Sequence, residues 1–340
     1  MRRLARRRHL NADGTVDVAV ANSGIVGFDP GNARILTNNG SGAFANATVL
    51  TTGFNPVSIA VAHLNGDNFL DLVTANSESS DISVFLRDAS ALTTVAGTTF
   101  LPPRKHETSP RPVEIIPGGL SNPKDLDNDL AVACLGNTPG SGGGTVDVLR
   151  NLAPGTGDLA PSVPLPISNV TGSLAVLDMD NDNDSDIAVL AQGTGPNTGA
   201  NVVRVLRNDT ANAGTGQLTF ALQPGEISAN SPTLIRSGDV NNDGQNDLVT
   251  INSGAALRPT GGDPERNTNP ISVIRTSAPP PLCPGDLNND NQVNTTDLVA
   301  FLGRFGTTVP PYTQGDLNGS GTVNTADLVI FLGRFGQPCP

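Results

Sequence analysis

The chain has few of the side chains that most often carry catalysis or bind sugars. Its 340 residues contain no Trp, a single Tyr, Tyr312, and three His, at positions 9, 63 and 106. Small-molecule sites, sugar sites among them, rely on aromatic walls, so this shortage argues against direct carbohydrate recognition. No nucleophile motif is present, and three His leave little material for acid–base catalysis. His106 lies in a polar stretch that we expect to be a solvated loop.

Long apolar segments and basic stripes are also missing. No stretch is long and apolar enough to span a membrane. Beyond the first eight residues no basic stripe occurs, which argues against a nucleic-acid partner. The net charge is −12, and most of the 32 acidic residues lie inside short repeated motifs. The acidity therefore indicates cation sites rather than attraction to a basic partner.

A repeated acidic motif, D-x-[DN]-x-D-G-x-x-D, dominates the first 275 residues, and each copy is followed by a short apolar segment. Its closing Asp recurs every 54–61 residues, at positions 17, 71, 129, 186 and 247. The third copy has decayed, because Asp125, Asp127 and Asp129 lack the regular spacing. Carboxylates so close together would repel one another without a cation. Turn chemistry is the alternative explanation, because Asp, Asn and Gly favour tight turns without any metal.

Each period contains four short apolar segments, as in PVSIAVAHL before the motif, DLVTANS after it, a third such as ISVFLRD and a weaker fourth such as TTFLPP or LTFALQP. Four short strands separated by Gly, Pro, Asn and Asp predict the blade of a β-propeller. No helical period of useful length occurs before residue 290. We therefore expect a mainly β fold, with a propeller of about five visible blades at residues 1–276 and a small α-helical domain after it.

These repeats resemble the FG-GAP or VCBS repeat family, which also occurs in integrin α-chains, over residues 9–276. The resemblance implies one calcium ion per intact loop, held by oxygens at motif positions 1, 3, 5, 7 and 9, and about two to four ions in all. His9 and His63 stand at position 1 of the first two loops, where a hard cation prefers oxygen. The implied ligands are Asn11, Asp13 and Asp17; Asn65, Asp67 and Asp71; Asp178, Asp180, Asp182, Asp184 and Asp186; and Asp239, Asn241, Asp243, Gln245 and Asp247.

The first residues are basic, with no apolar segment that would complete a signal peptide. We expect no strand before the first motif, since the chain begins almost at that motif. One interpretation is an N-terminal truncation, with more blades and a secretion signal upstream. The other is a basic tail in front of a five-bladed propeller. The Arg residues concerned are Arg2, Arg3, Arg6, Arg7 and Arg8.

Residues 283–340 contain a second kind of loop, twelve residues long and present twice, thirty residues apart. Oxygen-bearing side chains at positions 1, 3, 5, 9 and 12, with a carbonyl at 7, have the spacing that wraps a hard cation. Each loop leads into an amphipathic segment, for which Thr295 and Thr325 are predicted N-caps and Gly306 and Gly336 predicted ends. The candidate ligands are Asp286, Asn288, Asp290, Gln292, Asn294 and Asp297, and Asp316, Asn318, Ser320, Thr322, Asn324 and Asp327.

This duplicated loop and helix resembles the type I dockerin domain. Dockerins bind cohesin domains and so hold secreted proteins, often polysaccharide-degrading enzymes, on a scaffold or cell surface. The resemblance implies two calcium ions and cohesin contacts at loop positions 10 and 11, which are Thr295, Thr296, Thr325 and Ala326. It also implies neighbouring domain ends, and hence a disulfide between Cys283 and Cys339; two free surface thiols are the alternative.

Residues 277–282 read as a Pro-rich linker between the two domains. The remaining cysteine, Cys134, lies in the alternating run LAVACLG and is predicted to be buried and unpaired.

We expect a secreted, non-catalytic adhesion or assembly protein without catalytic residues, located outside the cell or on its surface. Its expected partner is a cohesin-type domain, in a polysaccharide-degradation or cell-surface setting. Two alternatives stay open: a polysaccharide lyase or hydrolase on a propeller scaffold, and a lectin-like carbohydrate binder anchored by the tail. The first alternative is disfavoured because nearly all acidic residues are assigned to cation loops. The second is disfavoured because the chain has few aromatic residues for binding sugars.

Overall fold

The computed structural model describes most strands and both helices of the chain. The described residues are 3–8, 10, 13–25, 28–67, 69–88, 99–120, 128–137, 143–152, 156–165, 167, 169–179, 184–193, 201–208, 218–223, 231–240, 246–252, 271–274, 285–288, 292–309, 314–318 and 320–336.

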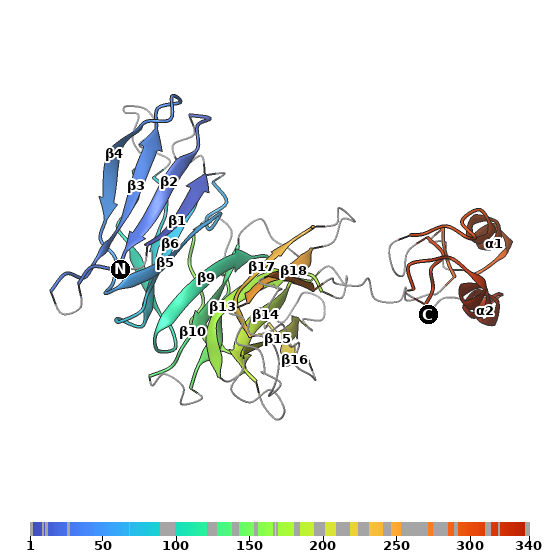
Figure 1. Cartoon of the computed structure of the whole chain (residues 1–340). Helices are drawn as coiled ribbons and strands as arrows, with labels where there is room; N and C mark the ends of the chain where they lie inside the picture. The colour runs from blue at the N-terminus through green and yellow to red at the C-terminus, as the bar shows by residue number, and fades with distance from the viewer. Residues whose placement is uncertain are drawn as a thin grey trace, which may run out of the picture. The chain divides into compact units, whose positions relative to one another are not determined.

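The fold is mainly β, with five antiparallel sheets of three or four strands in which neighbours in sequence are neighbours in the sheet (Figure 1). The first two sheets contain β1 (Arg3–Arg8), β2 (Asp17–Asn22), β3 (Asn32–Asn38) and β4 (Phe44–Leu50), then β5 (Pro56–Ala62), β6 (Asp71–Asn76), β7 (Asp81–Phe85) and β8 (Arg104–Glu107). The third and fourth contain β9 (Pro112–Gly118), β10 (Asp129–Cys134), β11 (Thr145–Leu149) and β12 (Val163–Pro164), then β13 (Val170–Leu177), β14 (Asp186–Gln192), β15 (Asn201–Asn208) and β16 (Phe220–Leu222). The fifth contains β17 (Pro232–Gly238), β18 (Asp247–Asn252) and β19 (Ile271–Ile274).

The Arg-rich start of the chain forms a strand, so the prediction that no strand precedes the first motif was wrong. β1 pairs with β2 from Arg3 opposite Asn22 to Arg8 opposite Asp17. The sequence RLARRR has little of the apolar alternation that predicts a strand. Strand pairing uses backbone groups, which every residue except Pro possesses, and those groups leave no mark in the side-chain pattern.

The fourth strand of the second sheet also lies elsewhere than predicted. It is β8, and the predicted segment TTFLPP contributes only a bridge between Phe100 and Arg87. Pro102 and Pro103 lack the N–H groups that a paired strand needs. His106, predicted in a solvated loop, therefore lies on a strand opposite Ile82.

Neighbouring sheets share hydrophobic clusters. Phe85 of the second sheet packs with Ile35 of the first. In the next cluster, Ile115 of the third sheet packs with residues of the second, and the third and fourth sheets share a further cluster. Cys134 is a fully buried free cysteine in this core, as predicted, and burial raises the pKa of its thiol.

The chain forms two compact units. The first is Met1–Leu177 with Asp184–Arg236 and Val249–Ser272, and the second is Asp178–Asn183 with Ser237–Leu248 and Val273–Pro340. The second unit carries α1 (Thr295–Leu302) and α2 (Thr325–Arg334), the two helices of the described residues. Its core consists of Val293, Phe301, Val309, Leu317, Val323 and Phe331. The predicted linker and both Cys283 and Cys339 lie outside the described residues.

Candidate cation-binding loops

The closing Asp of every motif is the first residue of the second strand of its sheet. All five carboxylates are fully buried, although Asp is rarely buried without partners. These residues are Asp17, Asp71, Asp129, Asp186 and Asp247.

In the second sheet, both oxygens of the closing Asp accept backbone N–H groups. Asp71 Oδ2 accepts from Leu64 N at 2.9 Å, and Asp71 Oδ1 accepts from Arg87 N at 2.8 Å. The carboxylate thus fastens the motif loop to the segment that follows the third strand. Burial raises the pKa of Asp71 to about 6, although these two backbone donors act to lower it.

The same pair of bonds recurs in the first and third sheets. Asp17 accepts from Leu10 N at 2.7 Å and from Asn38 N at 3.0 Å. Asp129, in the decayed third motif, accepts from Leu120 N at 3.1 Å and from Asn151 N at 2.7 Å. The closing Asp therefore has a structural role that survives loss of the rest of the motif. Sequence reasoning missed this role, although the persistence of Asp129 in a decayed copy was a signal for it.

Parts of the same pattern are visible in the last two sheets. Asp186 Oδ1 accepts from Asn208 N at 2.8 Å. Asp247 Oδ2 accepts from Val240 N at 3.3 Å. Asp178, Asp184 and Asp239 are also described and half-buried or exposed. The remaining predicted ligands, Asn11, Asp180, Asp182, Asn241, Asp243 and Gln245, lie outside the described residues.

Within the described part of the chain, no three carboxylate, imidazole or thiol groups lie together as a metal site would require. The centres of the fourth and fifth ligand sets fall outside that part. In the first loop, Asp13 Oδ1 accepts the N–H and the hydroxyl of Thr15, at 2.7 and 2.6 Å. In the second, Asn65 Nδ2 donates to Asp67 Oδ2 at 2.9 Å.

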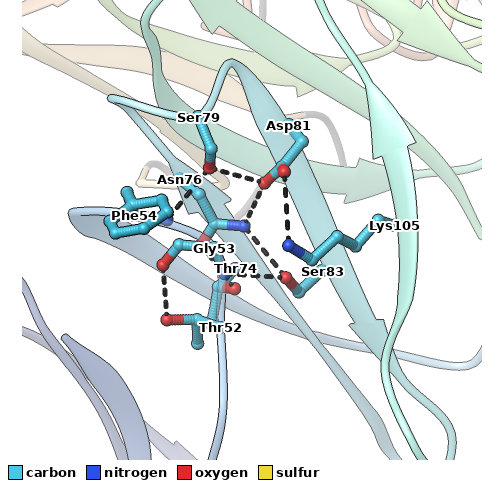
Figure 2. A network of polar contacts seen from close by, with 9 residues as sticks. All are labelled: Thr52, Gly53, Phe54, Thr74, Asn76, Ser79, Asp81, Ser83 and Lys105. Carbon is cyan, nitrogen blue, oxygen red and sulfur yellow. Dashed lines mark hydrogen bonds and ion pairs between the residues drawn. The ribbon is translucent and has the colours of Figure 1, made fainter. Parts of the chain in front are cut away.

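A buried polar network lies at the other end of the second sheet (Figure 2). Asn76, fully buried, donates to Asp81 Oδ1 at 2.6 Å and to Ser83 Oγ at 2.9 Å. Gly53 N donates to Ser83 Oγ at 3.3 Å, and a Cβ at Gly53 would overlap Asp81 Oδ1 and Ser79 Oγ. These groups satisfy one another's hydrogen bonds. We therefore interpret the network as a link between the strands and the loop before β5, and not as a ligand site.

A polar pocket of about 470 Å³ opens among the first strands of the second to fifth sheets. In its wall, Arg236 Nη2 lies 2.7 Å from Glu114 Oε1, and Arg236 Nη1 donates to Ser173 Oγ at 3.0 Å. Leu174 N donates to Glu114 Oε2 at 3.0 Å. Both charged groups are thus engaged with the protein itself, and the pocket offers no unpaired acid for catalysis.

Comparison with models of protein families identifies part of this strand region. Residues 9–102 contain an FG-GAP-like repeat. The match spans the first two motif loops and the strands from β2 to β7. No curated protein matches the chain. The FG-GAP-like match thus covers the first two units of loop and strands.

The tail loops fold around their acidic residues. Asp316, at position 1 of the second loop, is fully buried and accepts from Ser320 N at 3.0 Å and from Gly321 N at 2.7 Å. Asn318 Oδ1 also accepts from Ser320 N, at 2.9 Å. Ser320 Oγ donates to the carbonyl of Thr322 at 3.1 Å. Positions 1 and 3 therefore share the backbone donor of Ser320, and the Ser320 hydroxyl links positions 5 and 7.

Position 12 is a buried Asp in both tail loops. Asp297 Oδ1 accepts from Leu287 N at 2.8 Å and from Asn288 N at 3.2 Å. Asp327 accepts from Leu317 N and Asn318 N in the same way, at 2.8 and 3.0 Å. The other oxygen of each carboxylate, Oδ2, accepts a single N–H, from Asn294 or Asn324, and so keeps a lone pair for a further contact. The donor set suits a hard cation, since it offers carboxylate, amide and carbonyl oxygens.

The prediction that Thr295 and Thr325 cap the helices was wrong. The N-caps are Asn294 and Asn324, whose side chains accept from Thr296 N and Ala326 N, each at 2.8 Å. The position-12 Asp stands at N3 and accepts the N–H of the capping Asn, which completes a capping box. Position 9, predicted as a ligand, thus also begins the helix. The first-loop ligand Asp290 lies outside the described residues, and Gln292 is exposed.

The two tail repeats support each other reciprocally. Gly306 N, after α1, donates to Val323 O of the second loop at 2.8 Å, and Gly336 N donates to Val293 O of the first at 2.7 Å. Phe301 and Phe331 meet between them, with ring centroids 5.4 Å apart. Neither repeat could bury its Phe alone, so the duplication is a requirement of this small core.

The predicted docking residues Thr295, Thr296, Thr325 and Ala326 are all exposed. An apolar side chain follows each pair on the surface, since Val299 and Val329 are both 71% exposed. Leu302 and Leu332 are exposed as well. The tail therefore shows the same mixed hydroxyl and apolar surface twice.

Proposed function

We propose that the chain is a secreted, calcium-binding, non-catalytic assembly protein, whose tail is a dockerin-like domain that binds a cohesin-type partner. The observation that carries this proposal is the duplicated tail surface. Two acidic loops each position a helix whose exposed start bears the predicted contact residues. A surface with unpartnered Val299, Leu302, Val329 and Leu332 is more typical of an interface than of a domain that acts alone.

The strand region is proposed to be a β-propeller of FG-GAP-like blades. In support, each sheet is a meander, and the first strands of neighbouring sheets contact one another: β1 with β5, β5 with β9, and β9 with β13. The FG-GAP-like match to residues 9–102 agrees with this arrangement. In this proposal the propeller presents a further ligand surface, and the tail anchors it outside the cell, in a cell-surface or polysaccharide-degrading assembly.

Calcium is proposed at both tail loops and at the fourth and fifth strand loops. The tail donor sets support this, because each loop brings carboxylate, amide and carbonyl oxygens into one short segment, and these are the ligands that a calcium ion prefers. A calcium ion would supply there the positive charge that holds the loop oxygens together. The residues that would hold it in the tail are Asp286, Asn288, Asp290, Asn294 and Asp297 in the first loop, and Asp316, Asn318, Ser320, Asn324 and Asp327 in the second, with the carbonyls of Gln292 and Thr322.

The test is calcium-dependent binding to a panel of purified type I cohesin domains, measured by calorimetry with the full chain. Binding in calcium, and its loss in chelator, would support the proposal. The variant Thr296→Asp with Ala326→Asp should abolish binding, while Asp158→Asn, an exposed change in the strand region, should leave it unchanged. Folded protein that binds no cohesin domain in calcium would reject the docking role.

A further inference from the structure

The second strand loop, residues 63–71, differs from the fourth and fifth loops at position 1, and from the first, third and fourth sheets in the residue whose N–H reaches the closing Asp. Position 1 is His63 rather than a carboxylate. The residue whose N–H donates to Oδ1 of the closing Asp is Arg87, whereas the first, third and fourth sheets have Asn there. Those Asn residues are Asn38, Asn151 and Asn208.

Arg87 is a buried cation set among carboxylates. It is only 3% exposed, and its guanidinium carbon lies 5.2 Å from the centroid of the Phe69 ring. Asp17 of the first loop, Asp67 and Asp71 all act on it electrostatically and favour its charged form. Burial alone lowers the pKa of Arg87, but a guanidinium stays protonated in proteins. The positive charge of Arg87 therefore lies within electrostatic range of carboxylates in two neighbouring loops, and its buried Nε has no hydrogen-bond partner among the described residues.

His63 occupies the carbonyl that the motif would offer to a cation. Its Nδ1 lies 3.1 Å from the oxygen of Phe69, at motif position 7, so the ring must donate an N–H there. Phe69 N in turn donates to Asp67 Oδ1 at 2.8 Å. Imidazole supplies nitrogen where a hard cation needs oxygen, which removes the first ligand and engages a second.

We propose that the second strand loop binds no calcium ion, because the buried positive charge of Arg87 takes the place of the ion's charge and the His63 ring occupies the position-7 carbonyl. A divalent cation beside a buried guanidinium would be repelled at short range, in surroundings that screen charge poorly. The second loop thus keeps its acidic motif, but the compensating positive charge comes from a side chain of the protein and not from a bound ion. Its contrast with the fourth and fifth loops rests on the calcium binding proposed above.

The experiment counts calcium ions bound by the full chain, by equilibrium dialysis with radioactive calcium after removal of bound metal. Asp67→Asn should leave the count unchanged, because that loop holds no ion. The matched control is Asp182→Asn, the same position in the fourth loop, which should lower the count by one. A drop of one ion in Asp67→Asn would overturn the proposal.

A gain of binding tests the same idea from the other side. His63→Asp together with Arg87→Asn gives the second loop the residues that the fourth loop has at these positions, Asp178 and Asn208, and this variant should bind one additional ion. Adding Asp67→Asn should remove that ion again. A folded double variant that gains no calcium would overturn the proposal; folding is checked by its strand circular dichroism.

The melting temperature in chelator gives an independent readout. Arg87→Asn should melt below the natural chain, because Asp17, Asp67 and Asp71 then lack their cation. Calcium should restore the melting temperature of the double variant. An unchanged melting temperature for Arg87→Asn in chelator would count against the proposal. If Asp182→Asn leaves the ion count unchanged, calcium at the fourth loop fails, while the second-loop variants still decide this inference.

Discussion

The strand loops and the tail loops both end on a buried Asp, but this Asp begins a strand of a packed sheet in one case and lies in the first turn of a short helix in the other. In the strand region, Asp71 and Asp129 fasten a loop to the strands of a sheet that is packed against its neighbours. In the tail, Asp297 and Asp327 stand at the third position of a short helix, in a unit with a core of six buried residues. With calcium bound as proposed above, we expect the fold of the strand region to survive loss of the ions, and the tail to unfold without them.

Calcium removal should have the largest effect, and it should separate the two regions. The tail has a core of six buried residues, so the calcium binding proposed above would contribute most of its folding free energy. Chelator should unfold residues 285–336 while the strand region keeps its fold. Hydrogen exchange of the full chain should show fast exchange in α1 and α2 and continued protection in β6 and β10. Equal protection of the helices with and without chelator would contradict the comparison.

The closing Asp of the decayed third loop gives the next largest effect. Asp129→Asn replaces one acceptor by an amide donor and leaves a buried N–H of Leu120 or Asn151 unsatisfied. The expected loss is about 2–4 kcal/mol of unfolding free energy, measured in urea. Asp158→Asn, which breaks an exposed pair with Arg104, should cost less than about 1 kcal/mol. A cost for Asp129→Asn no larger than this control would show that the carboxylate is not structural.

The network of Figure 2 allows a third test of how tightly the strand region is packed. Gly53→Ala would push a methyl group into Asp81 and Ser79, and should cost about 1–3 kcal/mol. Gly238→Ala is the control, because a Cβ there meets no atom within 4 Å. Urea unfolding of both variants would reveal the difference, and equal stability would mean that the loop before β5 yields easily.

The smallest effect concerns His106 and the pH dependence of stability. Burial, and then Arg104, lower the pKa of His106, so the unfolded chain binds its proton more readily than the folded chain does. Stability should therefore fall as the pH drops below the unfolded value of about 6.5. His106→Gln should show a flatter decline between pH 7 and pH 5 in urea unfolding. Identical slopes would mean that the ring is hydrated in the folded protein.

Much of the strand region was predictable because its signals are local. Period-2 apolar segments and turn residues predicted the mainly β fold and the order of strands around each motif, and the alternation around Cys134 predicted its burial. The predictions failed where side chains carry little signal. β1 forms through backbone pairing, and β8 follows two Pro residues that ended the expected strand.

For the candidate sites too, part of the arrangement was predictable from the sequence and part was not. Spacing alone identified the acidic positions of both kinds of loop, because ligands on one short loop must be close in sequence. The hydrogen-bond donors of those positions lie in the same loop, as Leu287 does for Asp297, or near the end of the third strand, as Arg87 does for Asp71. Spacing does not specify these backbone donors, so the tertiary structure was needed to reveal them. It made Asn294 and Asn324 the caps and gave the closing Asp residues their backbone donors. The repeated sequence thus determined where the acidic residues lie, and the packing of the chain decided which groups contact them, since a buried charge is costly without a partner.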